Sequence, residues 1–198
     1  MPELDLSATS LDLTRAICDI PSVSGDETVL ADAIDAAVRQ LPHLEVHRDG
    51  DTIVARTHGD RDRRVVIAGH IDTVPINGNV PVRDVAIDGE PYLWGRGTVD
   101  MKAGVAVQLK LAAELADPRV DITWMWYDHE EVDADLNGLT RLAAHRPDLF
   151  AGDFAILGEP TGGEVEGGCN GNLRAIVRTH GVRAHSARAW VGENAIHR

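Results

Sequence analysis

Residues 65–75 read Val-Val-Ile-Ala-Gly-His-Ile-Asp-Thr-Val-Pro, an apolar run that leads into a histidine and an aspartate two residues apart. The run Val65 to Ala68 predicts a short buried strand. Ligands of open α/β sheets bind at the carboxyl ends of the strands. His70 is therefore a candidate metal ligand, and Asp72 is the candidate carboxylate that orients the imidazole and raises its basicity.

Three further acidic clusters follow at wide intervals. They are Asp100 after the turn Gly95-Arg96-Gly97, the pair Glu130-Glu131 after Ile122–Tyr127, and Glu159 after Phe154–Leu157. Histidine nitrogen and carboxylate oxygen are both zinc ligands. Two ions about 3.5–4 Å apart need a bridging ligand, and a carboxylate with its two oxygens is suited to that position. The set predicts a dinuclear metal hydrolase with Asp100 as the bridge.

The adjacent pair Glu130-Glu131 can serve two roles. In an extended chain neighbouring side chains point to opposite sides, so one glutamate can face a metal and the other the substrate. Taken alone, a His-x-Asp motif is more often structural, and a Glu-Glu pair is usually solvated. The glycines at 95 and 97 lack the strand–Gly-x-Gly-x-x-Gly–helix setting of a phosphate loop. It is the combination of clusters that favours metal chemistry.

Composition narrows the class of protein. The 198 residues suffice for one sizeable core, and 43% hydrophobic with 26% charged residues indicates a soluble globular chain. The net charge of −13 argues against nucleic acid or an anionic membrane as partner. Cys18 and Cys169 show no paired spacing, so no disulfide framework or cysteine zinc site is expected. No signal peptide is evident, and the cytoplasm is the expected compartment.

Alternating apolar patterns predict an α/β sheet with helices on its faces. Ser24 to Glu27 has the spacing of a capping box ahead of a helix that ends at Pro42. Residues 76–91 lack periodicity and are expected to form a long loop. The other expected elements are helices over 11–20, 102–115 and 138–145, and strands over 44–47, 52–56, 65–68, 122–127, 154–157 and 173–179.

The ordered motifs resemble those of a zinc-dependent family of aminoacylases, carboxypeptidases and succinyl-diaminopimelate desuccinylases. The resemblance covers about residues 10–190, and Ala184–Arg188 with Asn194–His197 is similar to desuccinylases of actinobacterial type. It implies a zinc-peptidase-like sheet with helices on both faces, plus the start of a smaller α+β lid that mediates dimerisation. The expected domains are a catalytic domain over 1–168, with its carboxy-terminal part missing, and the beginning of the lid over 169–198. The matching pieces are Gly69–Pro75, Gly95–Gly104, Glu130-Glu131 and Gly158–Thr161.

The resemblance also implies a role for each candidate residue. His70 and Glu159 would bind one zinc, Asp100 would bridge, and Glu131 would bind the second zinc. Glu130 would be the general base, Asp72 the orienting carboxylate, and His185 the lid histidine that reaches the active site of the partner subunit. Two departures stand out: His129 replaces an acidic residue that is frequent in the family, and the family's last histidine ligand falls beyond Arg198. The sequence therefore looks like an amino-terminal fragment.

The expected activity is hydrolysis of N-succinyl-LL-2,6-diaminopimelate to succinate and diaminopimelate in lysine biosynthesis. The expected enzyme is a homodimer acting on a small N-acyl amino acid, with two Zn²⁺ per full-length subunit; Co²⁺ or Mn²⁺ would also suit such ligands. The first alternative is a related deacylase, such as an acetylornithine deacetylase, or a metallo-dipeptidase or carboxypeptidase. The second is a non-catalytic metal-binding homologue, against which the presence of both Asp72 and Glu130 argues.

Overall fold

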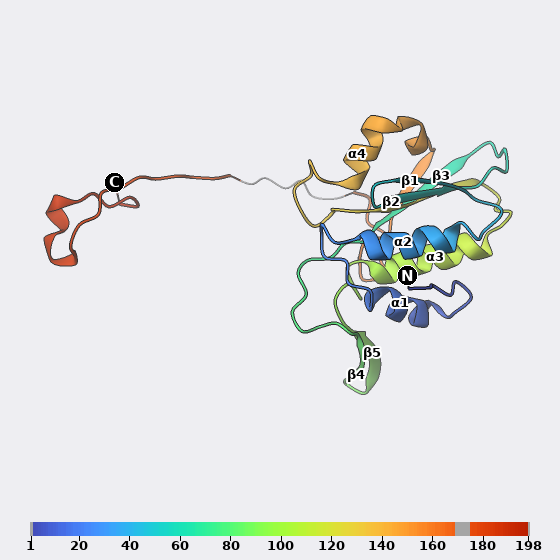
Figure 1. Ribbon diagram of the computed structural model, residues 1–198, viewed down its shortest axis with the longest axis horizontal. Helices are drawn as coiled ribbons and strands as arrows, with labels where there is room; N and C mark the ends of the chain where they lie inside the picture. The colour runs from blue at the N-terminus through green and yellow to red at the C-terminus, as the bar shows by residue number, and fades with distance from the viewer. Residues whose placement is uncertain (1, 169–174, 198) are drawn as a thin grey trace. The chain divides into compact units, whose positions relative to one another are not determined.

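The computed structural model describes residues 2–168 and 175–197 (Figure 1). Contacts divide the chain into two units, Met1–Gly163 and Glu164–Arg198. The first unit contains the sheet and the helices that cover it, and the second is described by itself below. Among the described residues, none of the helices has the length and apolar character needed to cross a membrane.

A five-stranded mixed sheet forms the centre of the first unit, in the order β1-β2-β6-β3-β7. β3, β6 and β7 run parallel, whereas β2 is antiparallel to both β1 and β6. The three parallel strands end at the same edge, so the segments that follow them lie side by side. The strands are β1 (Glu45–Asp49), β2 (Thr52–Arg56), β3 (Arg64–His70), β6 (Asp121–Tyr127) and β7 (Phe154–Leu157).

Helices cover both faces of this sheet, as the sequence predicts (Figure 1). One face packs against α2 (Thr28–Val38) and α3 (Lys102–Glu114), and α1 (Ser10–Cys18) packs on α3. The apolar side chains of these helices form the larger core with Trp124 and Trp126. The other face packs against α4 (Gly138–His145) and the 3₁₀ turn η1 (Pro147–Phe150). Every residue of β6 is buried, which explains its mostly apolar sequence.

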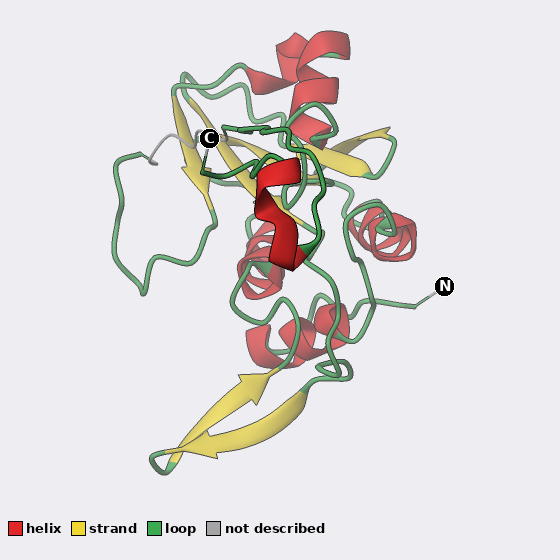
Figure 2. Ribbon diagram, turned by 90° about the vertical axis from the view of Figure 1, so that its left-hand side faces the viewer, coloured by secondary structure: helices red, strands yellow, loops and turns green. Residues whose placement is uncertain are grey.

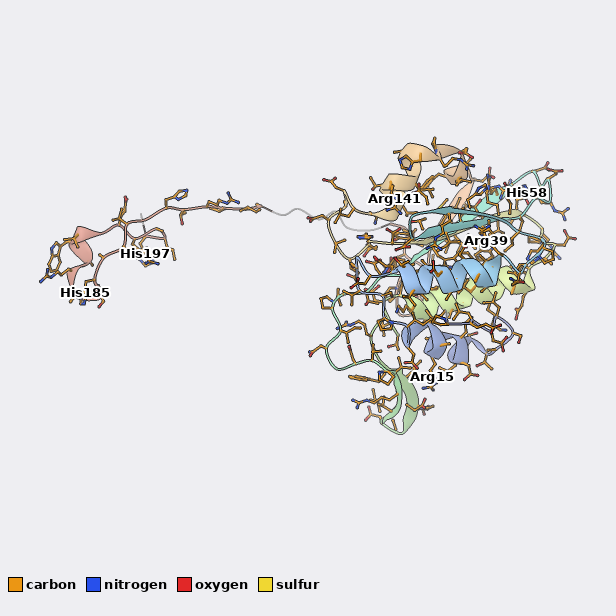
Figure 3. The ribbon with its side chains drawn as sticks, viewed as in Figure 1. Arg15, Arg39, His58, Arg141, His185 and His197 are labelled. Carbon is orange, nitrogen blue, oxygen red and sulfur yellow. The ribbon has the colours of Figure 1, made fainter. Side chains whose placement is uncertain are left out.

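A β-hairpin replaces part of the loop expected over 76–91, and that prediction was wrong. β4 (Arg83–Ile87) pairs with β5 (Glu90–Trp94) apart from the main sheet, and the hairpin projects beyond α1 (Figure 2). Asp88 and Gly89 both have positive φ, the conformation of the two-residue turns that join such strands. Most of the paired residues are exposed, so the strands show no apolar alternation. Arg15 of α1, which Figure 3 labels, contacts Asp84 of β4 at 2.6 Å.

Two smaller expectations also fail. Ser24 does not cap α2, which begins at Thr28 after Glu27 and has no side-chain capping bond. The Ser24 hydroxyl donates instead to the Asp72 carboxylate, 2.6 Å away. Of the strand expected over 173–179, residues 175–179 are not in a strand, and residues 173 and 174 lie outside the described part of the chain.

α3 approaches the end of β7 through a glycine. A Cβ on Gly104 would lie 2.6 Å from the carbonyl oxygen of Gly158, far inside van der Waals contact. Gly158 directly precedes Glu159, so this contact sets where the last of the candidate ligands leaves the sheet. Glycine is therefore required here for close packing, even though it is a poor helix former.

We predict that Gly104→Ala destabilises the protein by about 1–3 kcal/mol because the added methyl group overpacks the α3–β7 contact. Helix propensity alone predicts the opposite, a gain of about 1 kcal/mol. Urea unfolding of the parent protein and of Gly104→Ala decides between the two predictions. The variant Ala113→Gly, in the same helix, measures the effect of helix propensity. A stabilised Gly104→Ala would show that α3 and β7 can separate freely.

Candidate metal centre

His70 is the last residue of β3, and its side chain is 1% exposed. Its Nε2 atom lies 3.0 Å from Asp100 Oδ1 and 3.9 Å from Glu159 Oε2. Its Nδ1 atom faces the other way, 3.0 Å from the Asp72 carbonyl oxygen and 3.4 Å from Asp72 Oδ1. One nitrogen of the ring is thus held by Asp72 while the other points at a group of carboxylates.

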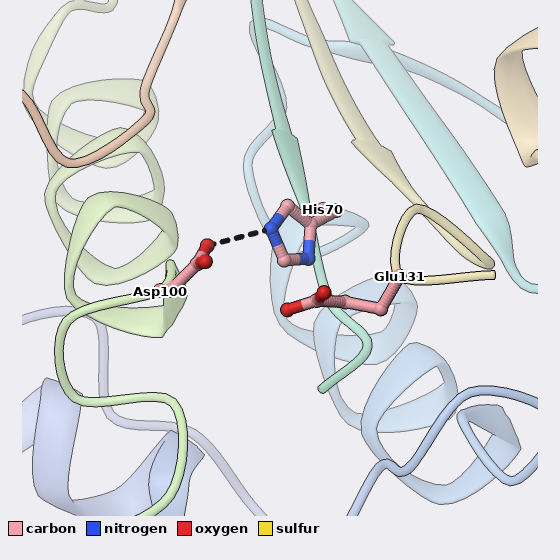
Figure 4. Close-up of side chains that lie close together, drawn as sticks. All are labelled: His70, Asp100 and Glu131. Carbon is pink, nitrogen blue, oxygen red and sulfur yellow. Dashed lines mark hydrogen bonds and ion pairs between the residues drawn. The ribbon is translucent and has the colours of Figure 1, made fainter. Parts of the chain in front are cut away.

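Glu131 completes a cluster with His70 and Asp100 (Figure 4). One ligand atom from each of the three residues lies within 4.8 Å of the other two. Within residues 2–168 and 175–197, no other group of three histidine, cysteine or acidic side chains meets this condition. The three residues come from different segments: His70 from β3, Asp100 from the segment before α3, and Glu131 from the turn after β6. The segment after β7 brings Glu159 to His70.

The buried Asp72 carboxylate joins this cluster to the rest of the protein. Its Oδ1 atom accepts the Glu130 amide and its Oδ2 atom accepts the Glu131 amide, both at 3.0 Å, in addition to the Ser24 hydroxyl. Burial alone would raise its pKa, but the hydrogen bonds from His70, Ser24 and the two amides outweigh burial and bring the pKa to about 2. Asp72 is therefore an anion that fixes the backbone of the glutamate pair.

The electrostatics of the cluster favour a bound cation. Burial raises the pKa of Glu131 and Glu159, and the neighbouring Asp100 raises both further. Burial disfavours the charged His70 imidazole, but Asp72 and the surrounding carboxylates outweigh it and raise its pKa to about 9. One imidazole faces several carboxylates, which leaves an excess of negative charge. Its nitrogen and oxygen donors are the ligands that zinc accepts, so the residues present fit a divalent metal ion.

Glu130 is exposed, next to the cluster, and outside the group of three. Its charge reaches the site, because it contributes to the raised pKa of Glu131 and of Glu159. The two neighbouring glutamates therefore occupy different environments. Their assignment as base and ligand stays a prediction.

His185 lies in the second unit, Glu164–Arg198. It precedes the 3₁₀ segment η2 (Ser186–Val191), and its Nδ1 atom accepts the Ala187 amide at 3.2 Å. A single β-bridge between Val182 and Glu193 closes the loop around it. That this unit begins a lid, and that His185 serves a partner subunit, stay predictions.

Sequence reasoning missed one buried cation beside the cluster. Lys102, at the start of α3, is 1% exposed, and its Nζ atom donates to the Ile20 carbonyl at 2.8 Å and to that of Ile17 at 3.4 Å. Burial lowers its pKa to about 8, against the opposing negative charges of Asp72 and Asp19. Helical spacing could have predicted this burial, because Lys102 lies on the same face of α3 as the buried Val105, Ala106 and Leu109.

The chain matches the family model described as peptidase family M20/M25/M40 over residues 66–187, more than half of its length. That segment contains the three-residue cluster, Asp72, Glu130, Glu159 and His185. The chain belongs to this family.

Two relatives from actinobacteria are about half identical to this chain over the region that aligns. A succinyl-diaminopimelate desuccinylase of Corynebacterium glutamicum is 49% identical over 202 residues, which is 100% of this chain and 54% of that protein. A Mycobacterium tuberculosis protein, whose assignment as the same enzyme is provisional, is 48% identical over 98% of this chain and 54% of its own length. The chain thus spans about half the length of the curated relatives it matches.

Solved structures of low sequence identity share the fold. A tripeptidase from Staphylococcus aureus has a TM-score of 0.65 at 17% identity, covering 98% of this chain and 54% of that one. An M20 family metallo-carboxypeptidase from Sulfolobus solfataricus has a TM-score of 0.61 at 15% identity, covering 76% and 37%. At these identities the likeness concerns the fold, and it agrees with the mixed sheet described above.

We predict that Asp100→Ala in the full-length protein reduces bound zinc, because it removes a donor from the cluster at its centre. The matched control is Glu90→Ala, which removes an exposed carboxylate from the β4–β5 hairpin. Zinc per chain, measured by mass spectrometry after dialysis, should fall in the first variant and stay at the parent level in the second. Equal zinc contents in both variants would remove Asp100 from the site.

Proposed function

We propose that this chain provides the metal-binding half of a dinuclear zinc amide hydrolase. The observation that supports this most strongly is the convergence of His70, Asp100 and Glu131 within 4.8 Å. Glu159 Oε2 lies 3.9 Å from His70 Nε2, and Glu130 lies on the same turn as Glu131. A binding site needs the ligands alone, whereas an exposed carboxylate beside them is what a hydrolase requires.

His70 and Glu159 would hold one ion, Asp100 would lie between the two ions, and Glu131 would hold the second. The described residues offer the second ion only Asp100 and Glu131, fewer protein ligands than a zinc site usually has. Zinc in such a site polarises a carbonyl oxygen and makes a bound water more acidic. Co²⁺ or Mn²⁺ would suit the same donors.

Glu130 would act as the general base. Its carboxylate would accept a proton from the attacking water and return that proton to the leaving amine, a transfer that needs one group to act first as base and then as acid. The backbone amides of Glu130 and Glu131 are held by Asp72, so the carboxylate starts from a fixed point. The adjacent Glu131 would remain committed to the metal.

The substrate we propose is N-succinyl-LL-2,6-diaminopimelate, cleaved to succinate and diaminopimelate. The named Corynebacterium glutamicum relative supports this choice, since it matches all of this chain at 49% identity. In this proposal the full-length protein is a homodimer, and His185 of each subunit completes the site of its partner. A related deacylase or dipeptidase with the same metal site is the second candidate, because the tripeptidase and carboxypeptidase structures share the fold.

We predict that Glu130→Gln in the full-length protein keeps its zinc and loses ~10²–10⁴-fold in kcat, because an amide cannot accept the proton. Glu131→Gln is the matched neighbour, expected to lose zinc together with activity. Turnover and zinc content are measured on the same preparations. If Glu130→Gln loses zinc and Glu131→Gln retains it, the two roles are reversed.

We predict that the full-length enzyme cleaves N-succinyl-diaminopimelate with a far higher kcat/KM than N-acetylornithine or simple dipeptides. The reason is the sequence similarity to desuccinylases over the entire chain. Kinetics on the three substrates with one zinc-loaded preparation provide the measurement. Comparable values for an acetylated amino acid would assign the protein to the deacylase alternative.

A further inference from the structure

The turn that carries the glutamate pair contains a disfavoured backbone conformation. His129 has φ of +59°, in the left-handed region that residues with a Cβ seldom occupy. β6 ends at Tyr127, and Asp128 and His129 follow it. His129 therefore directly precedes the pair Glu130-Glu131. Such a conformation persists only where the surroundings hold it in place. The contacts of His129 should therefore identify what holds the turn.

Glu27 is the side chain that makes these contacts. It is fully buried, and it comes from the turn before α2, 102 residues earlier in the chain. Its Oε1 atom accepts the His129 amide at 3.2 Å and lies 3.3 Å from His129 Nδ1. Its Oε2 atom accepts the Gly25 amide at 2.8 Å. Both oxygens of the carboxylate are thus in use, one on each turn.

Asp128 contacts the same ring nitrogen of His129 as Glu27 does. His129 Nδ1 lies 2.7 Å from Asp128 Oδ2. Asp128 is itself fixed by Arg141 of α4, whose Nη2 atom donates to Oδ1 at 2.8 Å, and by the Thr52 hydroxyl at 2.5 Å. Two buried carboxylates therefore lie near one nitrogen of the imidazole, and Glu27 is the one that also accepts the His129 backbone amide.

We propose that Glu27 is a positioning residue for the Glu130-Glu131 pair, an inference that rests on the proposed function of that pair. Three successive amides, those of His129, Glu130 and Glu131, donate to two buried carboxylates, Glu27 and Asp72. Asp72 fixes the second and third amides, and Glu27 fixes the first. Both glutamate side chains leave the turn from this backbone, so their directions depend on both anchors.

Glu27→Gln in the full-length protein tests this role with little change in shape. An amide has one acceptor oxygen, whereas Glu27 accepts one backbone amide at each oxygen, so one of the two N–H groups must lose its partner. Asp121→Asn is the matched control. Asp121 is also buried and accepts the amides of Gly59 and Arg61 at separate oxygens, but it lies at the opposite end of β6.

We expect Glu27→Gln to lower kcat by ~10–100-fold, the usual effect of losing a group that orients a catalytic or ligating residue, with KM near the parent value. Hydrogen exchange of the segment 128–131 should accelerate in the same variant. Asp121→Asn should accelerate exchange around residues 57–61 and leave kcat near the parent value. If Glu27→Gln fails to fold, Glu27→Asp serves, since it keeps both acceptors on a shorter side chain and should show the same changes in weaker form.

Hydrogen exchange of the segment 128–131 tests this inference separately from the proposed function. Should the parent protein show no amide hydrolysis, the proposed function fails, and faster exchange at 128–131 still supports the anchoring role of Glu27. Unchanged kcat and unchanged exchange in a folded Glu27→Gln protein would overturn the inference. So would an equal loss of kcat in Asp121→Asn, because the effect would then follow from lost stability alone.

Discussion

The hydrogen bonds between the Asp72 carboxylate and the amides of Glu130 and Glu131 are the constraint on which the site depends. A buried carboxylate is costly unless it is well paired, and Asp72 is paired with His70, with two backbone amides and with the Ser24 hydroxyl. Because its donors lie on the turn after β6 while Asp72 itself follows β3, the ends of two neighbouring parallel strands are joined. His70 lies two residues before Asp72, so the imidazole and the glutamate pair share one reference point.

Parallel pairing does the rest of the positioning. His70 is level with Tyr127 across the β3–β6 pair, and Ala68 is level with Leu157 across β3–β7. Three segments far apart in sequence therefore emerge at one edge and need only a few residues to converge. The antiparallel β1–β2 pair lies to one side of these strands and supplies none of the candidate ligands. Its contribution is indirect, since Thr52 fixes Asp128.

The sequence predicted those features that depend on apolar burial. β6, α3 and α4 were placed to within a residue or two, because buried strands and helices leave a continuous or periodic apolar pattern. The β4–β5 hairpin was missed because its residues are mostly exposed, although Asp88-Gly89 carried a turn signal. Motif spacing identified His70, Asp100, Glu131 and Glu159 as candidates. Glu27 and the Ser24–Asp72 bond left no such pattern, since a hydrogen bond across 102 or 48 residues has no periodicity.

The buried Lys102 makes the first helix part of the site's support. Its ammonium group donates two hydrogen bonds to carbonyl oxygens at the end of α1 and just beyond it, while Asp100 lies two residues before it in the chain. Removing the first twenty residues would take away both acceptors together with the α1 side chains that cover Lys102. The amino-terminal segment is therefore not a dispensable appendage, and trimming it by proteolysis would disturb the start of α3, next to Asp100 of the candidate metal site.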